Sequence, residues 1–141
     1  MSTEENKANF RRIFEGINQG NFAVIDEVCA PTLVSHYPSA TTHGSEAFKQ
    51  SFSRGLTAFP DSHYTIEDQL AEGDKVATRF TYSGTHQGEF MGIPPTGKHM
   101  TFTGMSLSHW VDGKLVENWN NDDTLGFLQQ LGIVPALGHT S

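Results

Sequence analysis

Hydrophobic residues in the first part of the chain recur at the spacing of amphipathic helices. Over residues 3–19 they fall at i, i+3, i+4 and i+7, which places them along one side of a helix. The same spacing recurs over residues 22–28 and 45–59, and a glycine or proline follows each segment. The sequence therefore predicts three helices with one apolar side each, formed by Phe10, Ile13, Phe14 and Ile17, by Phe22, Ile25 and Val28, and by Phe48, Phe52, Leu56 and Phe59.

The pattern changes from helical to alternating at Tyr64, where apolar and polar residues begin to take turns. Glycine-containing sequences at residues 72–75 and 111–114 are typical of β-hairpin turns. Residues 64–121 are therefore expected to form an antiparallel sheet of four longer strands. A short strand at residues 33–37 and a short helix at residues 124–131 complete the prediction, which is an α+β fold.

Three helices with apolar sides and a single sheet require that the helices cover one face of the sheet. A curved antiparallel sheet covered in this way is expected to form a cone-shaped barrel with an internal cavity, a natural place for a small molecule. We expect one domain over residues 1–135 and a C-terminal tail over residues 136–141.

Composition narrows the classes of partner. A formal net charge of −7 without a cluster of lysine and arginine argues against nucleic acid. The polar N-terminus lacks the apolar run of a signal peptide or membrane span, so a cytoplasmic protein without membrane contact is expected. Cys29 lies on an apolar helix side and is expected in the core. Histidines and carboxylates show no metal-ligand spacing, so no metal is expected, and the ligand should be small and hydrophobic.

A long loop, GTHQGEFMGIPPTGK at residues 84–98, lies between two predicted strands and has no strand pattern of its own. Its glycines and prolines fix several turns, and long constrained loops often serve a site. His86 is expected either to hold this loop through a hydrogen bond to the backbone or to contact a ligand.

Several short motifs occur in a fixed order along the chain: F-P-D at 59–61, E-G-D-K-V-A at 72–77, G-I-P-P-T-G at 92–97, D-G-K at 112–114 and E-x-W-x-x-x-D at 117–123. Together with the long loop, this ordered set resembles the SnoaL-like polyketide cyclases, which have the nuclear-transport-factor-2-like fold. The resemblance covers roughly residues 5–132.

The resemblance implies ring closure of an aromatic polyketide by an intramolecular aldol reaction, without a cofactor or metal. A carboxylate in an apolar pocket suits this chemistry, because burial raises its pKa toward neutral pH. In the family, that carboxylate lies three positions before the last aspartate of the E-x-W-x-x-x-D motif, with a histidine across the hairpin. Here these positions hold Asn120 and Ser106, which can hold a substrate oxygen but cannot accept a proton at neutral pH.

The hairpin register decides which residues accompany Ser106 and Asn120. If Gly113 is the bulge residue of a three-residue turn, Trp110 lies opposite Lys114, and Asp122 shares a face with Ser106 and Asn120. A two-residue turn would shift the register and separate Ser106 from Asn120. Under the first register the opposite face carries an apolar patch, which predicts a homodimer through the sheet: Met105, Leu107, Leu115 and Trp119.

Asp122 is therefore a candidate for a relocated acid/base. Asp123 either takes that role or caps the C-terminal helix, a position that aspartate favours. His36, at the end of the short strand, is either a catalytic partner or a histidine paired within the fold. Tyr82 and Phe102 belong to the core aromatics and are expected to line the cavity as ligand-binding residues.

Three functions remain open on this sequence. The first is an enzyme that moves protons on a hydrophobic, oxygenated substrate, giving cyclisation, isomerisation or dehydration. The second is a noncatalytic binding protein that kept the cavity without the base. The third, hydrolysis of a strained ring such as an epoxide, would need Arg79, Asp68 and Asn120 to meet inside the cavity.

Overall fold

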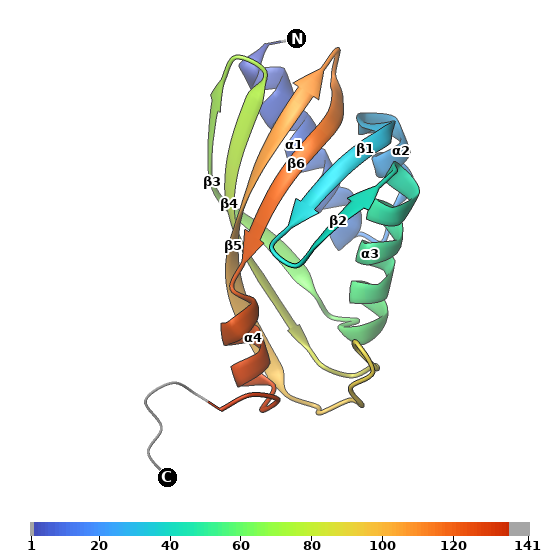
Figure 1. Cartoon of the computed structure of the whole chain (residues 1–141), viewed down its shortest axis with the longest axis vertical. Coiled ribbons are helices and arrows are strands. Elements are labelled where there is room, and N and C mark those ends of the chain that lie inside the picture. The colour runs from blue at the N-terminus through green and yellow to red at the C-terminus, as the bar shows by residue number, and fades with distance from the viewer. Residues whose placement is uncertain (1, 136–141) are drawn as a thin grey trace.

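The structure is a computed structural model and describes residues 2–135, so the predicted tail at residues 136–141 lies outside the described residues. The described part contains four helices and six strands (Figure 1). In chain order they are α1 (Thr3–Asn18), α2 (Ala23–Val28), β1 (Cys29–Tyr37), β2 (Ala40–His43), α3 (Ser45–Ala58), β3 (His63–Glu72), β4 (Lys75–Thr85), β5 (His99–Val111), β6 (Lys114–Asp122) and α4 (Thr124–Gln130).

The six strands form one curved sheet in the order β2-β1-β6-β5-β4-β3. Strand β1 runs parallel to β6, whereas the other neighbours are antiparallel. The α+β class is confirmed, but the sheet is mixed and remains open between its edge strands β2 and β3. The predicted cone-shaped barrel of an antiparallel sheet is thus corrected in two respects. The sheet is mixed because β1 pairs with β6 in the same direction, and it is not a barrel because β2 and β3 do not pair with each other.

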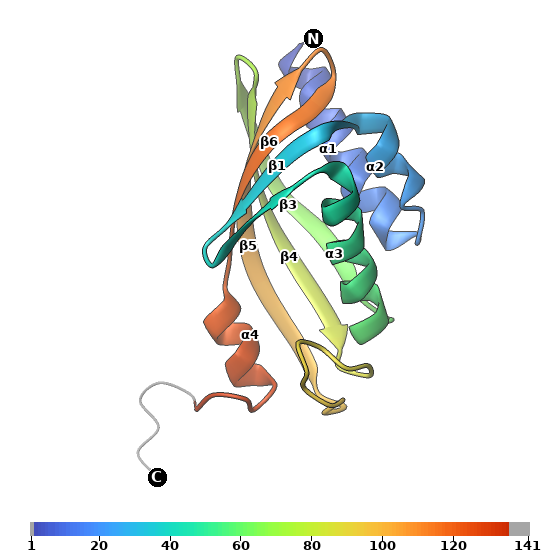
Figure 2. The same cartoon turned by 45° about the vertical axis from the view of Figure 1, so that its right-hand side comes forward.

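Helices α1, α2 and α3 pack on one face of the sheet (Figure 2). Helix α1 begins with a capping box formed by Ser2 and Glu5. Its predicted apolar side is buried, and it forms the main core cluster together with residues of α2, α3 and the sheet. Cys29 also belongs to this core, as expected, and burial raises the pKa of its thiol to about 12.

Strand β2 has no counterpart in the sequence prediction, which places no element between the strand at residues 33–37 and the helix at residues 45–59. It pairs with β1 through a tight turn in which Tyr37 lies opposite Ala40. Its residues are mostly exposed at the edge of the sheet. An edge strand of small polar residues buries no apolar side and therefore lacks the alternation that reveals a strand.

The β5–β6 hairpin has a two-residue turn, because Val111 lies opposite Lys114 and both Asp112 and Gly113 have positive φ. The predicted three-residue turn is therefore wrong. A bulge at Val116 adds one residue to β6 and compensates for the shorter turn, so Ser106 lies opposite Asn120 as expected. The shorter turn sets Leu115 opposite Trp110, and so places it in the core rather than in the predicted outer patch.

A second core cluster lies at the end of the molecule formed by α4 and the β4–β5 loop, and we call it the loop-end cluster. Tyr64 packs against both clusters. The members of the loop-end cluster come from α3, β4, β5, α4 and the residues that follow these elements: Ala58, Phe59, Tyr82, Met100, Phe127 and Leu131. Among residues 2–135, no helix combines the length and apolar character that a bilayer crossing requires.

Candidate functional site

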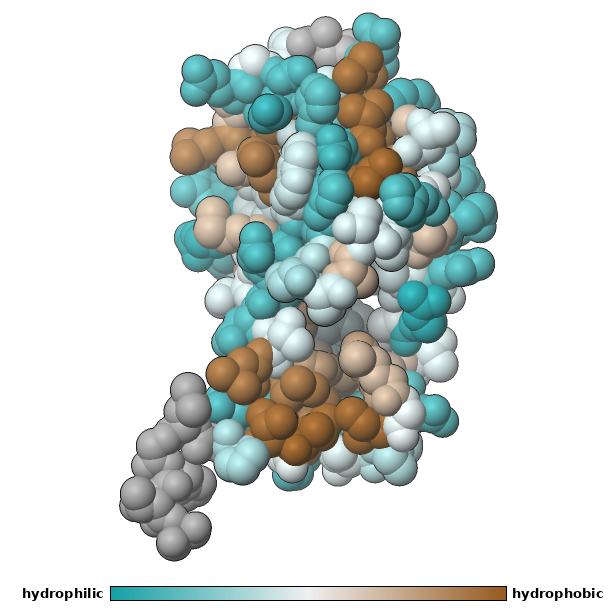
Figure 3. Space-filling model, in the orientation of Figure 1, coloured by the Kyte–Doolittle hydropathy of each residue, from teal (hydrophilic) through white to brown (hydrophobic). Residues whose placement is uncertain are grey.

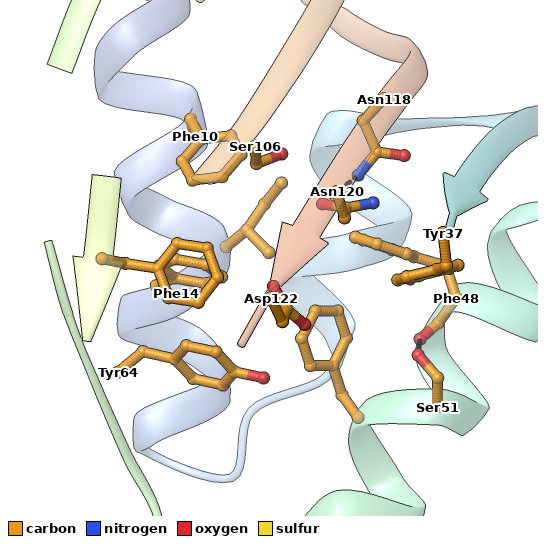
Figure 4. Close-up of a pocket in the computed structure, with 13 residues that line it drawn as sticks. Phe10, Phe14, Tyr37, Phe48, Ser51, Tyr64, Ser106, Asn118, Asn120 and Asp122 are labelled. Atoms are coloured by element: carbon orange, nitrogen blue, oxygen red, sulfur yellow. Dashed lines mark hydrogen bonds between the residues drawn. The ribbon is translucent and has the colours of Figure 1, made fainter. Parts of the chain in front are cut away.

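A pocket of ≈ 140 Å³ lies between the sheet and helices α1 and α3 (Figure 4). The apolar sides that the sequence predicted for α1 and α3 form the helical part of its wall, because these sides face the sheet. Phe14 stacks on Tyr64 with ring centroids 4.3 Å apart, and Phe48 meets Phe52 edge-on at 4.8 Å. The lining residues are Phe10, Ile13, Phe14, Tyr37, Phe48, Ser51, Phe52, Tyr64, Phe80, Ser106, Asn118, Asn120 and Asp122.

The sheet supplies a row of polar side chains to this apolar pocket. Ser106 of β5 faces Asn120 of β6, and Asp122 lies two cross-strand pairs further along, opposite Gly104 and on the same face. This inner face of the hairpin therefore joins Ser106, Asn120 and Asp122, as the sequence predicted. Asn118 also lines the pocket but was not singled out, although its position two residues before Asn120 on the same strand placed it on the same face.

Asp122 is the carboxylate of the pocket. Burial raises its pKa from 3.8 to about 6, and its Oδ1 has no hydrogen-bond partner among residues 2–135. Gly104 makes room for it, since a Cβ at that position would lie 2.6 Å from Asp122 Oδ1 and 2.6 Å from the Phe80 ring. Asp122 can thus exchange a proton near neutral pH inside an aromatic wall.

The amides beside Asp122 form a short chain of hydrogen bonds. Asn120 Nδ2 donates to the backbone oxygen of His36 at 3.3 Å, and Asn118 Nδ2 donates to Asn120 Oδ1 at 3.4 Å (Figure 4). Ser106 Oγ and Asn118 Oδ1 have no partner within the described part of the chain. Polar atoms of this kind are costly when buried unless a ligand or water completes them.

Asp123 and His36 do not share the pocket with Asp122. Asp123 is the N-cap of α4, where its Oδ1 accepts from the backbone N–H of Gly126 at 2.9 Å. His36 pairs with the outward-facing residues of β6. Its Nε2 donates to Glu117 Oε2 at 2.6 Å, and its ring stacks on Trp119 with centroids 5.4 Å apart. The side chains of Asp123 and His36 therefore do not line the pocket, and His36 reaches it only through the backbone oxygen that Asn120 binds.

His86 is fully buried and holds the ends of the β4–β5 loop together. Its backbone N–H donates to Lys98, its carbonyl accepts from Gly97, and its Nδ1 accepts from the N–H of Thr96 at 3.2 Å. This arrangement agrees with the loop-holding alternative. Tyr82 and Phe102 pack against each other in the loop-end cluster, with ring centroids 5.1 Å apart. Neither residue lines the pocket, so their predicted place in its wall is corrected.

The assembly proposed for ring hydrolysis does not form. Asp68 and Arg79 lie opposite each other on β3 and β4 and are both exposed, whereas Asn120 lines the pocket. The residues described in the structure also contain no group of three or more histidine, cysteine, aspartate or glutamate side chains arranged to hold a metal ion.

The fold and pocket together define an α+β protein that can enclose an apolar ring beside one proton-exchanging carboxylate. The family model of the SnoaL-like polyketide cyclases matches residues 8–131. The chain belongs to this family.

Two curated relatives illustrate the similarity. Aklanonic acid methyl ester cyclase DauD of Streptomyces sp. (strain C5) is 29% identical over 128 residues, which span 86% of this chain and 78% of the relative. Nogalonic acid methyl ester cyclase of Streptomyces nogalater is 27% identical over 121 residues, which span 82% and 88% of the two chains.

Solved structures agree with the family and the fold. AclR of Streptomyces galilaeus, a proposed hydroxylase, superposes with a TM-score of 0.87 at 32% identity and covers 96% of this chain and 86% of its own. IdmH of Streptomyces antibioticus, a proposed polyketide cyclase, gives a TM-score of 0.79 at 33% identity, with 90% and 98% of the two chains covered.

Proposed function

We propose that this protein catalyses a cofactor-independent proton transfer on a hydrophobic, oxygenated, polyketide-like substrate, leading to cyclisation, isomerisation or dehydration. The observation that carries the proposal is the Asp122 carboxyl, which lines an aromatic pocket and has a pKa raised to about 6 by burial. Such a carboxylate is ionised at neutral pH and basic enough to take a proton from carbon. The relatives named as methyl ester cyclases support the substrate class.

Neutral hydroxyls in the same pocket would assist Asp122. Ser106 Oγ is buried and without a protein partner among residues 2–135, so its O–H can donate to a carbonyl oxygen that gains charge as the proton leaves carbon. Burial holds the pKa of Tyr64 well above its usual value of 10, so its hydroxyl stays protonated. It points into the pocket on the side of Asp122 (Figure 4).

The size of the pocket limits how a substrate would enter. A cavity of ≈ 140 Å³ is close to the size that holds one benzene ring, about 150 Å³, and below the range of about 300–1,000 Å³ that encloses drug-sized ligands. We therefore propose that one ring of the substrate enters. The remaining rings of the substrate would lie outside the pocket, near the end of β6. The surface there has a hollow, and an apolar region over α4 and the neighbouring loop lies next to it (Figure 3).

The proposal is tested by replacing Asp122 with asparagine and measuring turnover of the methyl esters for which the relatives are named. Loss of the acid/base should lower the rate by about 10²- to 10⁴-fold. Asp123→Asn is the matched control, because asparagine also caps a helix and the residue lies outside the pocket. Equal turnover by wild type and Asp122→Asn would refute the assignment.

The alternative is a noncatalytic binding protein of the same fold. It is favoured by Asn120 and Ser106, which occupy the acid/base positions of the family and cannot exchange protons at neutral pH. Saturable binding of these esters by wild type without any product would support this alternative.

The predicted homodimer also remains a proposal. The outer face of the sheet exposes 54% of Met105 and 40% of Leu107, next to Trp119, although Leu115 no longer contributes. Sedimentation of the full chain should give twice the monomer mass, and a change of Leu107 to glutamate should restore the monomer.

A further inference from the structure

Asn118 lines the pocket and carries a buried hydrogen-bond acceptor that has no partner among residues 2–135. It lies on the inner face of β6, opposite Ser108, and only 2% of the residue is exposed. Its Oδ1 is buried and has no partner among residues 2–135, while the residue lines the pocket. A buried acceptor in an aromatic wall is unfavourable unless a molecule inside the pocket donates to it.

The orientation of the Asn118 amide follows from its neighbours. The backbone oxygen of His36 can only accept, so the NH₂ end of Asn120 faces it at 3.3 Å. The Oδ1 end of Asn120 then accepts from Asn118 Nδ2 at 3.4 Å. This chain of bonds leaves the Asn118 oxygen, rather than its NH₂ group, without a protein partner.

We infer that Asn118 is a specificity-determining residue that accepts a hydrogen bond from a ring hydroxyl of the substrate. The inference rests on the proposed function and narrows its substrate class to rings that carry an enol or phenol O–H. A hydroxyl satisfies both features of the site, because its ring packs against the aromatic wall and its proton completes Asn118 Oδ1. A ring with only a carbonyl, a methyl ether or a methyl group at that position leaves the acceptor unpaired.

Phenol and toluene provide a direct test, because they have similar size and differ in the hydroxyl. Both would be titrated into the full chain and followed by NMR chemical shifts, in wild type and in Asn118→Leu. The ratio of the two dissociation constants should change by about tenfold or more in favour of toluene in the variant. Comparing ratios between proteins cancels the different hydration of the two probes.

Ser51→Ala is the matched control. Ser51 also lines the pocket, but its hydroxyl already donates to the backbone oxygen of Phe48 at 2.7 Å, so the wild-type ratio should persist. Asn118→Ala serves as a second variant should leucine prevent folding, since alanine removes the acceptor without adding volume. Absence of saturable phenol binding to wild type, or an unchanged ratio in both Asn118 variants, would overturn the inference.

Turnover distinguishes this inference from the proposed function. If Asp122→Asn retains full turnover, the acid/base assignment fails while the phenol ratio still reports on Asn118. If Asp122→Asn abolishes turnover but the Asn118 variants keep the wild-type ratio, the proposed function stands and only the role of Asn118 is overturned.

Discussion

The two faces of the β5–β6 hairpin both carry polar side chains, but they differ in how these are paired. On the inner face Ser106, Asn118 and Asp122 each bury an atom that has no partner among residues 2–135. On the outer face the ionisable side chains are partly exposed and paired, as in His36 with Glu117 at 2.6 Å and His109 with Asp74 at 2.7 Å.

Under the proposed function, this difference separates groups that serve the fold from groups that serve a ligand. A buried polar group without a partner costs about 1–3 kcal/mol, whereas exposed ion pairs contribute about 0–1 kcal/mol. The inner face is therefore less stable than an apolar face of the same shape, and under the proposed function a bound substrate would complete its polar row. The polar groups of the outer face are completed by solvent and by their own hydrogen-bonded pairs.

The largest expected effect concerns pH and the inner face. Because the folded protein raises the pKa of Asp122 from 3.8 to about 6, ionisation favours unfolding. The contribution of the protonated carboxyl to stability is complete below about pH 4 and is lost as the pH rises through about 6. The free energy of unfolding of wild type should therefore fall between pH 4 and 7, relative to Asp122→Asn, by up to roughly 3 kcal/mol.

Urea denaturation of both proteins across this range measures that difference, and the other titrating groups cancel in the comparison. Parallel stability curves for wild type and Asp122→Asn would contradict a buried, ionisable Asp122. Turnover should show the reverse dependence, with an acid limb near pH 6, since the base acts only when ionised.

A smaller effect is expected when Gly104 is changed to alanine. The added Cβ would lie 2.6 Å from both Asp122 Oδ1 and the Phe80 ring, so the carboxylate and the ring must move. Overpacking of this kind typically lowers the free energy of unfolding by about 1–3 kcal/mol. Turnover should fall as well, because Asp122 leaves its position.

Met105→Ala is the control for Gly104→Ala, since Met105 is the next residue of β5 and faces outward with 54% of its surface exposed. It should leave turnover unchanged. If Gly104→Ala retained full turnover as well as stability, the close packing around Asp122 would have no role in positioning the carboxylate.

The smallest effect is expected for Glu117→Gln on the outer face, the counterpart of Asp122→Asn on the inner face. His36 can still donate to the glutamine oxygen, and the pair is partly solvated. The free energy of unfolding should change by less than about 1 kcal/mol, and turnover should not change. A loss of turnover comparable with that of Asp122→Asn would show that the two faces are coupled.

Much of the fold could be predicted because burial of an apolar side leaves a period in the sequence. The stripe from Phe10 to Ile17 gave α1, and the alternation from Tyr64 onward gave the long strands. Strand β2 and the parallel pairing of β1 with β6 left no such signal, since ATTH is exposed and a parallel neighbour adds no turn motif. The two alternatives for His36 stayed open for the same reason, because the face that it occupies follows from the pairing of β1 with β6.

The site was predicted in part through the two-residue period of β6. Asp122, Asn120 and Ser106 share a face by that period once Ser106 lies opposite Asn120. This pairing was predicted from a three-residue turn, whereas the structure reaches it through a two-residue turn and the bulge at Val116. The free acceptor on Asn118 could not be predicted, because it depends on the orientation of two amides and on a backbone oxygen from β1.

The bulge at Val116 also indicates where the length of this hairpin can vary during evolution. Deleting Val116 would leave Leu115 opposite Trp110 and Glu117 opposite His109, so the same side chains would still face the pocket. An insertion between Glu117 and Asp122 would instead exchange inner and outer residues beyond it. A hairpin one residue shorter between D-G-K and the polar row can therefore keep the same site, and a gap placed at Val116 keeps Ser106, Asn120 and Asp122 in register in an alignment.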